Sequence, residues 1–198
     1  MPHRIARASS AARAIRSLVL GLACALLAGC AGGASGLRPL GLAAEALPIE
    51  LSRFMGDWYV IAHIPLSTEA NAHEAVESYS LREDGTIDVR YRFCEGGLDG
   101  ERRELAMWAW VHDASTNAEW RVRPFWPLRL VYQIAELDPD YRVSVVVNHT
   151  DYAWVMARRP ELPEPTLAAI AQRLAESGHD ISRLRRVPHD DGACRGEG

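Results

Sequence analysis

The chain has 198 residues, 48% of them apolar and 24% charged, which fits a single globular domain. Its formal net charge is −4, and all 22 basic residues are arginine. An excess of acidic groups argues against a nucleic-acid partner and against docking on anionic lipid headgroups, because both attract basic surfaces.

Residues 1–29 have the pattern of a secretory signal peptide and are set aside from the fold. Four arginines and no acid precede an apolar stretch, 17–28, that is shorter than the roughly 20 residues a membrane-spanning helix needs. Small residues then stand directly before Cys30. This resembles the bacterial lipobox, whose cysteine is acylated and becomes the first residue of the mature chain. The alternative is a plain secretory signal followed by an incidental cysteine.

Removal of residues 1–29 would leave 18 arginines against 26 acids, a net charge of −8. Membrane attachment is therefore expected from acyl chains on Cys30, since each buried methylene contributes about 0.8 kcal/mol. Ala31, in place of aspartate, resembles outer-membrane lipoproteins and implies a domain that faces the periplasm. The small, Gly-rich residues 30–47 indicate a flexible tether.

Short apolar segments and turn signals alternate through the middle of the chain. Because the connections are short, neighbouring strands are expected to be antiparallel, since parallel neighbours need long crossovers. Eight such strands favour an all-β, closed up-and-down barrel that can hold one small ligand. A β-sandwich is the competing architecture. The expected strands are 58–64, 75–82, 86–94, 103–112, 118–124, 129–137, 141–148 and 152–158.

Side-chain alternation predicts which face of a strand points inward. In segment 86–94 an apolar set alternates with a charged set, and segment 118–124 does the same. Segment 103–112 is apolar on both faces, so its inward set stays open. The predicted inward residues of segments 86–94 and 118–124 are Ile87, Val89, Tyr91, Phe93, Trp120 and Val122.

The hydrophobic period changes after Pro163. Apolar residues at helical spacing predict one α-helix from about 164 to 177, closed by Gly178 and packed on the outside of the barrel. Residues 181–187 are expected to add one more strand. Residues 190–198 are expected to be a frayed tail.

Three stretches carry a family resemblance. Gly56, two residues before Trp58 in Gly56-Asp57-Trp58-Tyr59, opens the first strand. Thr150-Asp151-Tyr152 stands before the last strand, and Arg158 ends it. In this order the stretches resemble the lipocalin family, most closely its bacterial outer-membrane lipoprotein branch, over residues 48–189.

The resemblance implies an eight-stranded antiparallel lipocalin (calycin) barrel with one C-terminal helix outside. It places Arg158 over the Trp58 indole, a cation–π contact worth about 0.5–2 kcal/mol. That pair would close one end of the barrel, so a ligand would enter from the other. Asp151 is expected to cap the turn into the last strand.

Two cysteines remain after Cys30 in a compartment that is oxidising. Cys94 shares the outward parity of Arg90 and Arg92, where the C-terminal tail can reach it. Several lipocalins join an early-middle strand to the tail, so the resemblance implies a disulfide between Cys94 and Cys194. A nucleophilic Cys94 is the alternative, but no basic partner that would favour a thiolate can be placed beside it.

An apolar, blind-ended barrel implies a binding module for fatty acids or lysophospholipids, used in lipid storage or transport for envelope maintenance. A ligand carboxylate or phosphate is expected to meet Arg123, Arg129 or Tyr132 at the mouth. The sequence leaves open whether two barrels form a homodimer. The predicted lining residues are Val60, Tyr91, Trp120, Val122, Tyr132, Ile134, Trp154 and Met156.

Two alternatives stay open. One is a lipocalin-like enzyme that acts on a lipid or isoprenoid, which an inward-facing Glu136 or His112 would favour. The other is a structural envelope lipoprotein whose side chains fill the barrel. Neither a cofactor nor a metal site is expected, because the histidines are scattered and no His pair has ligand spacing.

Overall fold

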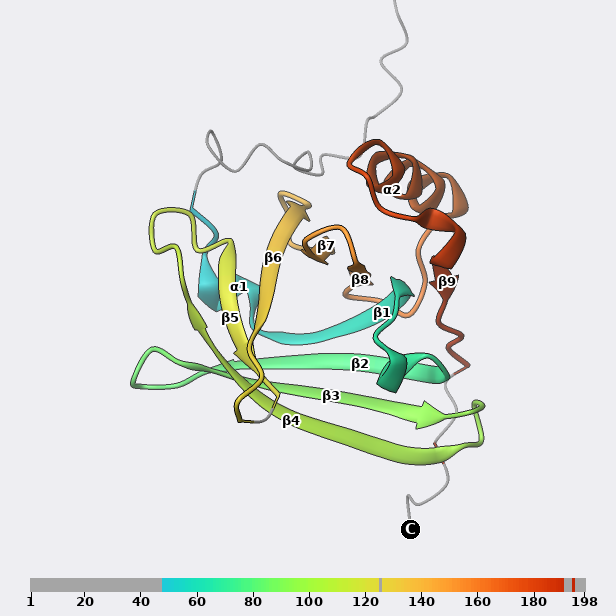
Figure 1. Ribbon diagram of the computed structural model, residues 1–198, viewed down its shortest axis with the longest axis horizontal. Helices are drawn as coiled ribbons and strands as arrows, with labels where there is room; N and C mark the ends of the chain where they lie inside the picture. The colour runs from blue at the N-terminus through green and yellow to red at the C-terminus, as the bar shows by residue number, and fades with distance from the viewer. Residues whose placement is uncertain (1–47, 125, 191–193, 195–198) are drawn as a thin grey trace, which may run out of the picture. The chain divides into compact units, whose positions relative to one another are not determined.

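The computed structural model describes residues 48–124, 126–190 and 194. Eight antiparallel strands form a closed barrel, and helix α2 packs against its outside (Figure 1). The predicted architecture is confirmed, and the β-sandwich alternative is wrong.

The predicted signal peptide, Cys30 and the tether, together with most of the predicted frayed tail, lie outside the described residues. The elements are α1 Leu51–Phe54, β1 Gly56–Ile64, η1 Ser67–Glu69, β2 Ala72–Leu81, β3 Ile87–Glu95, β4 Glu101–Val111, β5 Glu119–Arg123, β6 Leu130–Leu137, β7 Val143–Asn148, β8 Tyr152–Ala157, α2 Glu164–Glu176, η2 Ile181–Arg183 and β9 Arg185–Arg186.

The barrel closes because β1 pairs with two neighbours along its length. Residues 56–59 pair with β2, and residues 59–64 pair with β8. Every other consecutive pair from β2 to β8 is also antiparallel, as short connections require.

Strand pairing decides the orientation of β4, which the sequence left open. Met107 lies opposite Val89, and Ala109 lies opposite Ile87. Directly paired residues share a face of the sheet. Met107, Ala109 and Val111 therefore point inward, while Trp108 and Trp110 point outward.

A bulge in β1 gives the strand two inward-facing stretches. Its register against β8 shifts between Val60 and Ala62. Val60 belongs to the interior core, whereas Ala62 packs in a second cluster outside the barrel. The extra residue therefore turns His63 inward, where its side chain is fully buried.

Helix α2 completes the second cluster. Leu167, Ile170 and Leu174 are buried and share the cluster with outward-facing residues of β1, β7 and β8. Arg173 donates from Nε and Nη2 to the two carboxylate oxygens of Glu136, at 2.7 Å each. Glu136 thus faces the helix, not the interior. Among the described residues, no helix combines the length and apolarity that crossing a membrane requires.

The segment after α2 is only partly a strand. The prediction of a strand over 181–187 is wrong in extent, because 181–183 form a 3-10 turn and β9 has two residues. Beyond β9 the chain lies between β1 and β2: Val187 N donates to Ile61 O, and Glu74 N donates to Pro188 O. Backbone groups on strands that have parted are satisfied in this way.

The tail is joined to the barrel by a disulfide between Cys94 and Cys194, whose Cα atoms are 5.3 Å apart. Both cysteines are buried. A thiol nucleophile at Cys94 is incompatible with this bond. In the chain-entropy model, a disulfide that closes a loop of about 100 residues contributes up to about 4.7 kcal/mol.

The foot of the barrel is built around Arg158. Its guanidinium carbon lies 3.9 Å from the centre of the Trp58 ring, as the resemblance implied. Nη2 donates to the carbonyls of Phe54 and Met55 at 3.1 and 2.8 Å, and Nη1 donates to Asp57 O at 2.7 Å. One side chain therefore satisfies the carbonyl groups that follow α1 and covers the indole.

Gly56 allows this approach. Its φ is +90°, which favours glycine, and a Cβ there would lie 3.5 Å from Arg158 Nη1. At the opposite end, Thr150 and Asp151 form the β7–β8 turn before Tyr152. Asp151 contributes its main-chain carbonyl, which accepts from Arg183 Nη1 at 3.3 Å.

We expect Arg158→Ala to destabilise the fold by about 2–4 kcal/mol, because it removes the cation–π contact and leaves partly buried carbonyls unpaired. Arg158→Lys keeps the charge but not the planar fork, and should recover less than half of the loss. Urea unfolding at pH 7 measures both. Equal stability of wild type and Arg158→Ala would show that the foot does not depend on this residue.

Candidate ligand-binding site in the barrel interior

The eight predicted lining residues all lie in the interior. They are contributed by β1, β3, β5, β6 and β8 and are buried in one core cluster. The structure therefore brings together every residue that strand alternation and the resemblance assigned to the interior. Their role in ligand binding stays a prediction. The residues are Val60, Tyr91, Trp120, Val122, Tyr132, Ile134, Trp154 and Met156.

Aromatic rings form a continuous column through this interior. The Phe54 ring lies 4.9 Å from Trp58 at the foot and 5.4 Å from Trp120. Trp120 and Tyr132 are stacked at 5.4 Å, and Tyr132 and Trp154 are stacked at 6.4 Å. These spacings are typical of favourable aromatic pairs, so the column fixes one wall of the interior.

Glu77 is a buried acid that the sequence analysis did not select. It lies on the inward face of β2 between Ala75 and Tyr79, and its side chain is among the buried polar groups. Tyr132 Oη donates to Glu77 Oε2 at 3.2 Å, and Tyr79 Oη also donates to Glu77 Oε2. The signal in the sequence was one acid at an inward position of an otherwise weakly alternating strand.

Glu69 brings a second carboxylate to the interior from η1, in the β1–β2 connection. Trp154 Nε1 donates to Glu69 Oε2 at 3.0 Å. His63 Nδ1 lies 3.8 Å from the same oxygen. No periodicity applies to a connection, so the sequence alone held no signal that this acid would turn inward.

Burial controls the protonation of this cluster. Burial first, and then the charge of Glu69, raise the pKa of Glu77 from its ordinary value of 4.5 to about 8, against a smaller lowering by the Tyr132 hydrogen bond. Burial likewise raises the pKa of Tyr91 and of Tyr132. At neutral pH the Glu77 carboxyl is therefore mostly protonated.

Three polar atoms in the interior lack a hydrogen-bond partner among the described residues. They are Tyr91 Oη and both ring nitrogens of His63. Tyr91 is only 1% exposed, and His63 is fully buried. Unpaired buried groups are uncommon and costly, so these atoms mark a place where an additional molecule would be stabilised.

The inward face of β4 gives access to the interior. In chain order, the pairing of β4 with β5 begins at Trp108, opposite Arg123. Residues 101–107 of β4 therefore have no partner in β5. Leu105 lies opposite the inward-facing Tyr91, yet it is 39% exposed. Met107, next along this face, is half-buried against the interior core. Solvent therefore reaches the inner wall at these two residues.

The expected cationic mouth is not present. Arg123 lies on the outward face of β5, with its guanidinium 4.4 Å from the Trp108 ring. Arg129 lies 5.7 Å from the Trp110 ring, also outside. Of the three predicted headgroup partners only Tyr132 points inward. His112 is exposed on the outside, 4.0 Å from Glu119.

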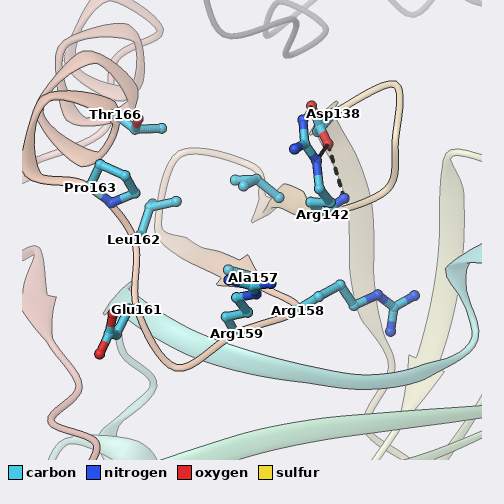
Figure 2. Close-up of a pocket in the computed structure, with 10 residues that line it drawn as sticks. Asp138, Arg142, Ala157, Arg158, Arg159, Glu161, Leu162, Pro163 and Thr166 are labelled. Atoms are coloured by element: carbon cyan, nitrogen blue, oxygen red, sulfur yellow. Dashed lines mark hydrogen bonds and ion pairs between the residues drawn. The ribbon is translucent and has the colours of Figure 1, made fainter.

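A separate cleft of about 490 Å³ lies outside the barrel, between the β7–β8 ends and the start of α2. Figure 2 shows Asp138 and Arg142 paired on one side and the 161–166 segment on the other. Arg142 is bound to Asp138 and Asp140, and Arg158 is bound to the foot carbonyls. Because these charges are already paired, the cleft is a weaker candidate than the interior.

Comparison with known proteins identifies the class. The family model described as "Lipocalin-like domain" matches residues 49–189, and the chain belongs to this family. The matched range covers every strand of the barrel and α2.

Named relatives refine this assignment. The chain is 30% identical to the outer membrane lipoprotein Blc of Vibrio cholerae over 86% of this chain and 96% of that protein. It is 29% identical to temperature-induced lipocalin-1 of Arabidopsis thaliana over 72% of this chain and 81% of that protein. Among solved structures, insecticyanin from the tobacco hornworm Manduca sexta has a TM-score of 0.56 at 17% identity, covering 81% of this chain and 93% of that one. This last similarity supports the fold alone.

We expect the wild-type free energy of unfolding to fall relative to that of Glu77→Gln as the pH rises from about 5 to about 8. The raised pKa means that the unfolded chain releases the Glu77 proton first, so the native advantage is full below pH 4.5 and lost through pH 8. The slope is roughly 1 kcal/mol for each pH unit. Urea titrations at unit pH steps measure it. Glu83→Gln, in an exposed turn, is the control, and parallel curves for wild type and Glu77→Gln would contradict the assignment.

Proposed function

We propose that this protein is a membrane-anchored lipid-binding lipocalin. It takes the acyl tail of a fatty acid or lysophospholipid into the barrel and stores or carries it for maintenance of the cell envelope. The observation that carries the proposal is an aromatic-lined interior whose inner wall is exposed at Leu105. Relatives named outer membrane lipoprotein Blc, and apolipoprotein D of Mus musculus at 28% identity over 68% of this chain, support it.

The physical basis is apolar burial. Each methylene group moved from water into the interior contributes about 0.8 kcal/mol, so a tail of ordinary length supplies enough free energy for tight binding. The closed foot at Trp58 and Arg158 leaves the other end and the β4 side as the route of entry.

Affinity should rise with tail length in a series of C8 to C16 lysophosphatidylcholines below their micelle concentrations, by about fourfold for each methylene. Met107→Trp, on the inner wall, should weaken binding at least tenfold. Ala106→Trp, on the outward face of the same strand, is the matched control and should leave it unchanged. Displacement of a fluorescent fatty acid measures all three.

A flat response to tail length would contradict the proposal and favour a structural lipoprotein with a filled barrel. Mass spectrometry of the recovered lipid separates binding from enzymatic turnover. Unchanged lipid is expected.

The anchor is the second part of the proposal. Cys30 carries the acyl chains, the tether 30–47 links it to the barrel, and the domain faces the periplasm from the outer membrane. Support comes from the lipobox pattern before Cys30 and from the names of the Blc relatives in Vibrio cholerae and Escherichia coli K12.

Cys30→Ala should release the protein from the membrane fraction into the soluble periplasm, since the acyl chains supply the attachment. Cell fractionation followed by immunoblotting measures the distribution. Cys24→Ala, in the segment that would be removed, is the control and should stay with membranes. Sedimentation of Cys30→Ala with the membranes would contradict the anchor.

A further inference from the structure

The interior contains acids where a fatty-acid site would need a base. Glu69 and Glu77 both point into the barrel, from η1 and β2, and are 6% and 5% exposed. The Tyr79, Tyr132 and Trp154 side chains donate hydrogen bonds to them. An ionised carboxylate can only accept hydrogen bonds, so the pair, once Glu77 has lost its proton, favours a ligand group that donates.

The cationic side chains nearest to the barrel wall, unlike the two acids, are directed outward or are already hydrogen-bonded. Arg123 and Arg129 stack on tryptophans of the outer surface. Arg185, in β9, is near enough to lower the pKa of Tyr91, but its Nη2 donates to Ala72 O at 3.3 Å. Within the described part of the chain, a ligand carboxylate near Tyr91 would therefore meet two carboxyl groups and Arg185, which is already hydrogen-bonded.

Aromatic faces surround the two acids. Tyr132 and Trp154, which bind the carboxylates, also belong to the stacked column with Trp120. The faces of such rings attract cations, with the largest effect at desolvated sites. Carboxylates and ring faces together form an environment suited to an ammonium group.

Unpaired polar atoms lie near the two acids. Tyr91 Oη has no partner, and the charges of Glu69 and Glu77 both act on its pKa, which shows that it lies near them. His63, also unpaired, is 3.8 Å from Glu69. A donor group seated between the acids would give a partner to Tyr91 Oη and to the acceptor nitrogen of His63. Among the described residues no three metal-type ligands come together.

We propose that the interior binds an amphiphile whose head is a protonated amine, with the ammonium between the carboxylates of Glu69 and Glu77. The tail lies along the inward face of β3 and β4 toward Leu105 and Met107. This rests on the lipid-binding part of the proposed function, the burial of an acyl tail in the barrel, and departs from it in the head group, which is cationic where a fatty acid has a carboxylate.

Binding of the ammonium group is coupled to the release of a proton from Glu77. The Glu77 carboxyl is mostly protonated at pH 7, so it loses its proton to the solvent as the ammonium arrives, while the amine keeps its own. The groups facing Glu77 are Glu69, His63, Tyr79, Tyr91 and Tyr132, with Arg185 beyond Tyr91. Amine affinity should therefore rise more than tenfold from pH 6.5 to pH 8.5, most steeply below pH 8.

The test compares dodecylamine, dodecanol and dodecanoate, which share a tail, by isothermal titration calorimetry below their critical micelle concentrations. We expect dodecylamine to bind at least tenfold more tightly than either of the others at pH 8. Repeating the titration in two buffers of different ionisation enthalpy measures the released proton, expected to approach one at pH 7.

Glu77→Gln and Glu69→Gln should each reduce the affinity for dodecylamine, relative to that for dodecanol in the same variant, at least fivefold. Glu83→Gln removes an acid outside the barrel and should change nothing. If a substituted protein does not fold, the pH profile and proton release of the wild type decide the question.

Equal affinity for the three ligands, or preference for dodecanoate, would overturn the amine site and leave the proposed function standing. Failure of all three to bind would overturn both. An amine preference unaffected by Glu77→Gln and Glu69→Gln would overturn the placement of the head between these acids.

Discussion

The contact between Arg158 and the foot of the barrel is the constraint on which the remaining structure depends. A planar guanidinium binds several main-chain carbonyls at once and also covers the Trp58 indole. Lysine has no such fork. With the chain after α1 fixed in this way, β1 starts in the correct register against both β2 and β8, and the sheet closes.

Because the barrel is closed at the foot, its two ends differ. The aromatic column begins at Trp58 and Phe54 and leads to Trp154, so the lower part of the barrel is filled by rings. Access is shifted to the side where β4 extends past β5. The wall formed by β1, β7 and β8 is covered by α2, whose Arg173 is paired with the buried Glu136, whereas the tail is held on β3, beside β4, through Cys94 and Cys194. Rigid walls of this kind limit the changes that a ligand can cause to the open side.

The two interior acids lower the stability of the folded state. Burial of Glu77 near Glu69 disfavours ionisation, and unpaired groups at Tyr91 and His63 add to the cost. A barrel that served only for stability would place apolar residues at these positions. Polar groups retained at a stability cost in an accessible interior are characteristic of a binding site.

The sequence by itself determined the strand order, the outer helix and the eight interior residues, while the Trp58–Arg158 foot was implied by the lipocalin resemblance. It did so because alternation, turn residues and helical period are local properties of the chain. The inward face of β4, the bulge that turns His63 inward and the entry of Glu69 were decided only by tertiary structure. A strand apolar on both faces takes its orientation from its partner, and a connection takes its course from what it covers. For Glu77 both levels contribute. Alternation along β2 indicates that its side chain points inward, but only the closed barrel shows that aromatic rings and a second carboxylate enclose it.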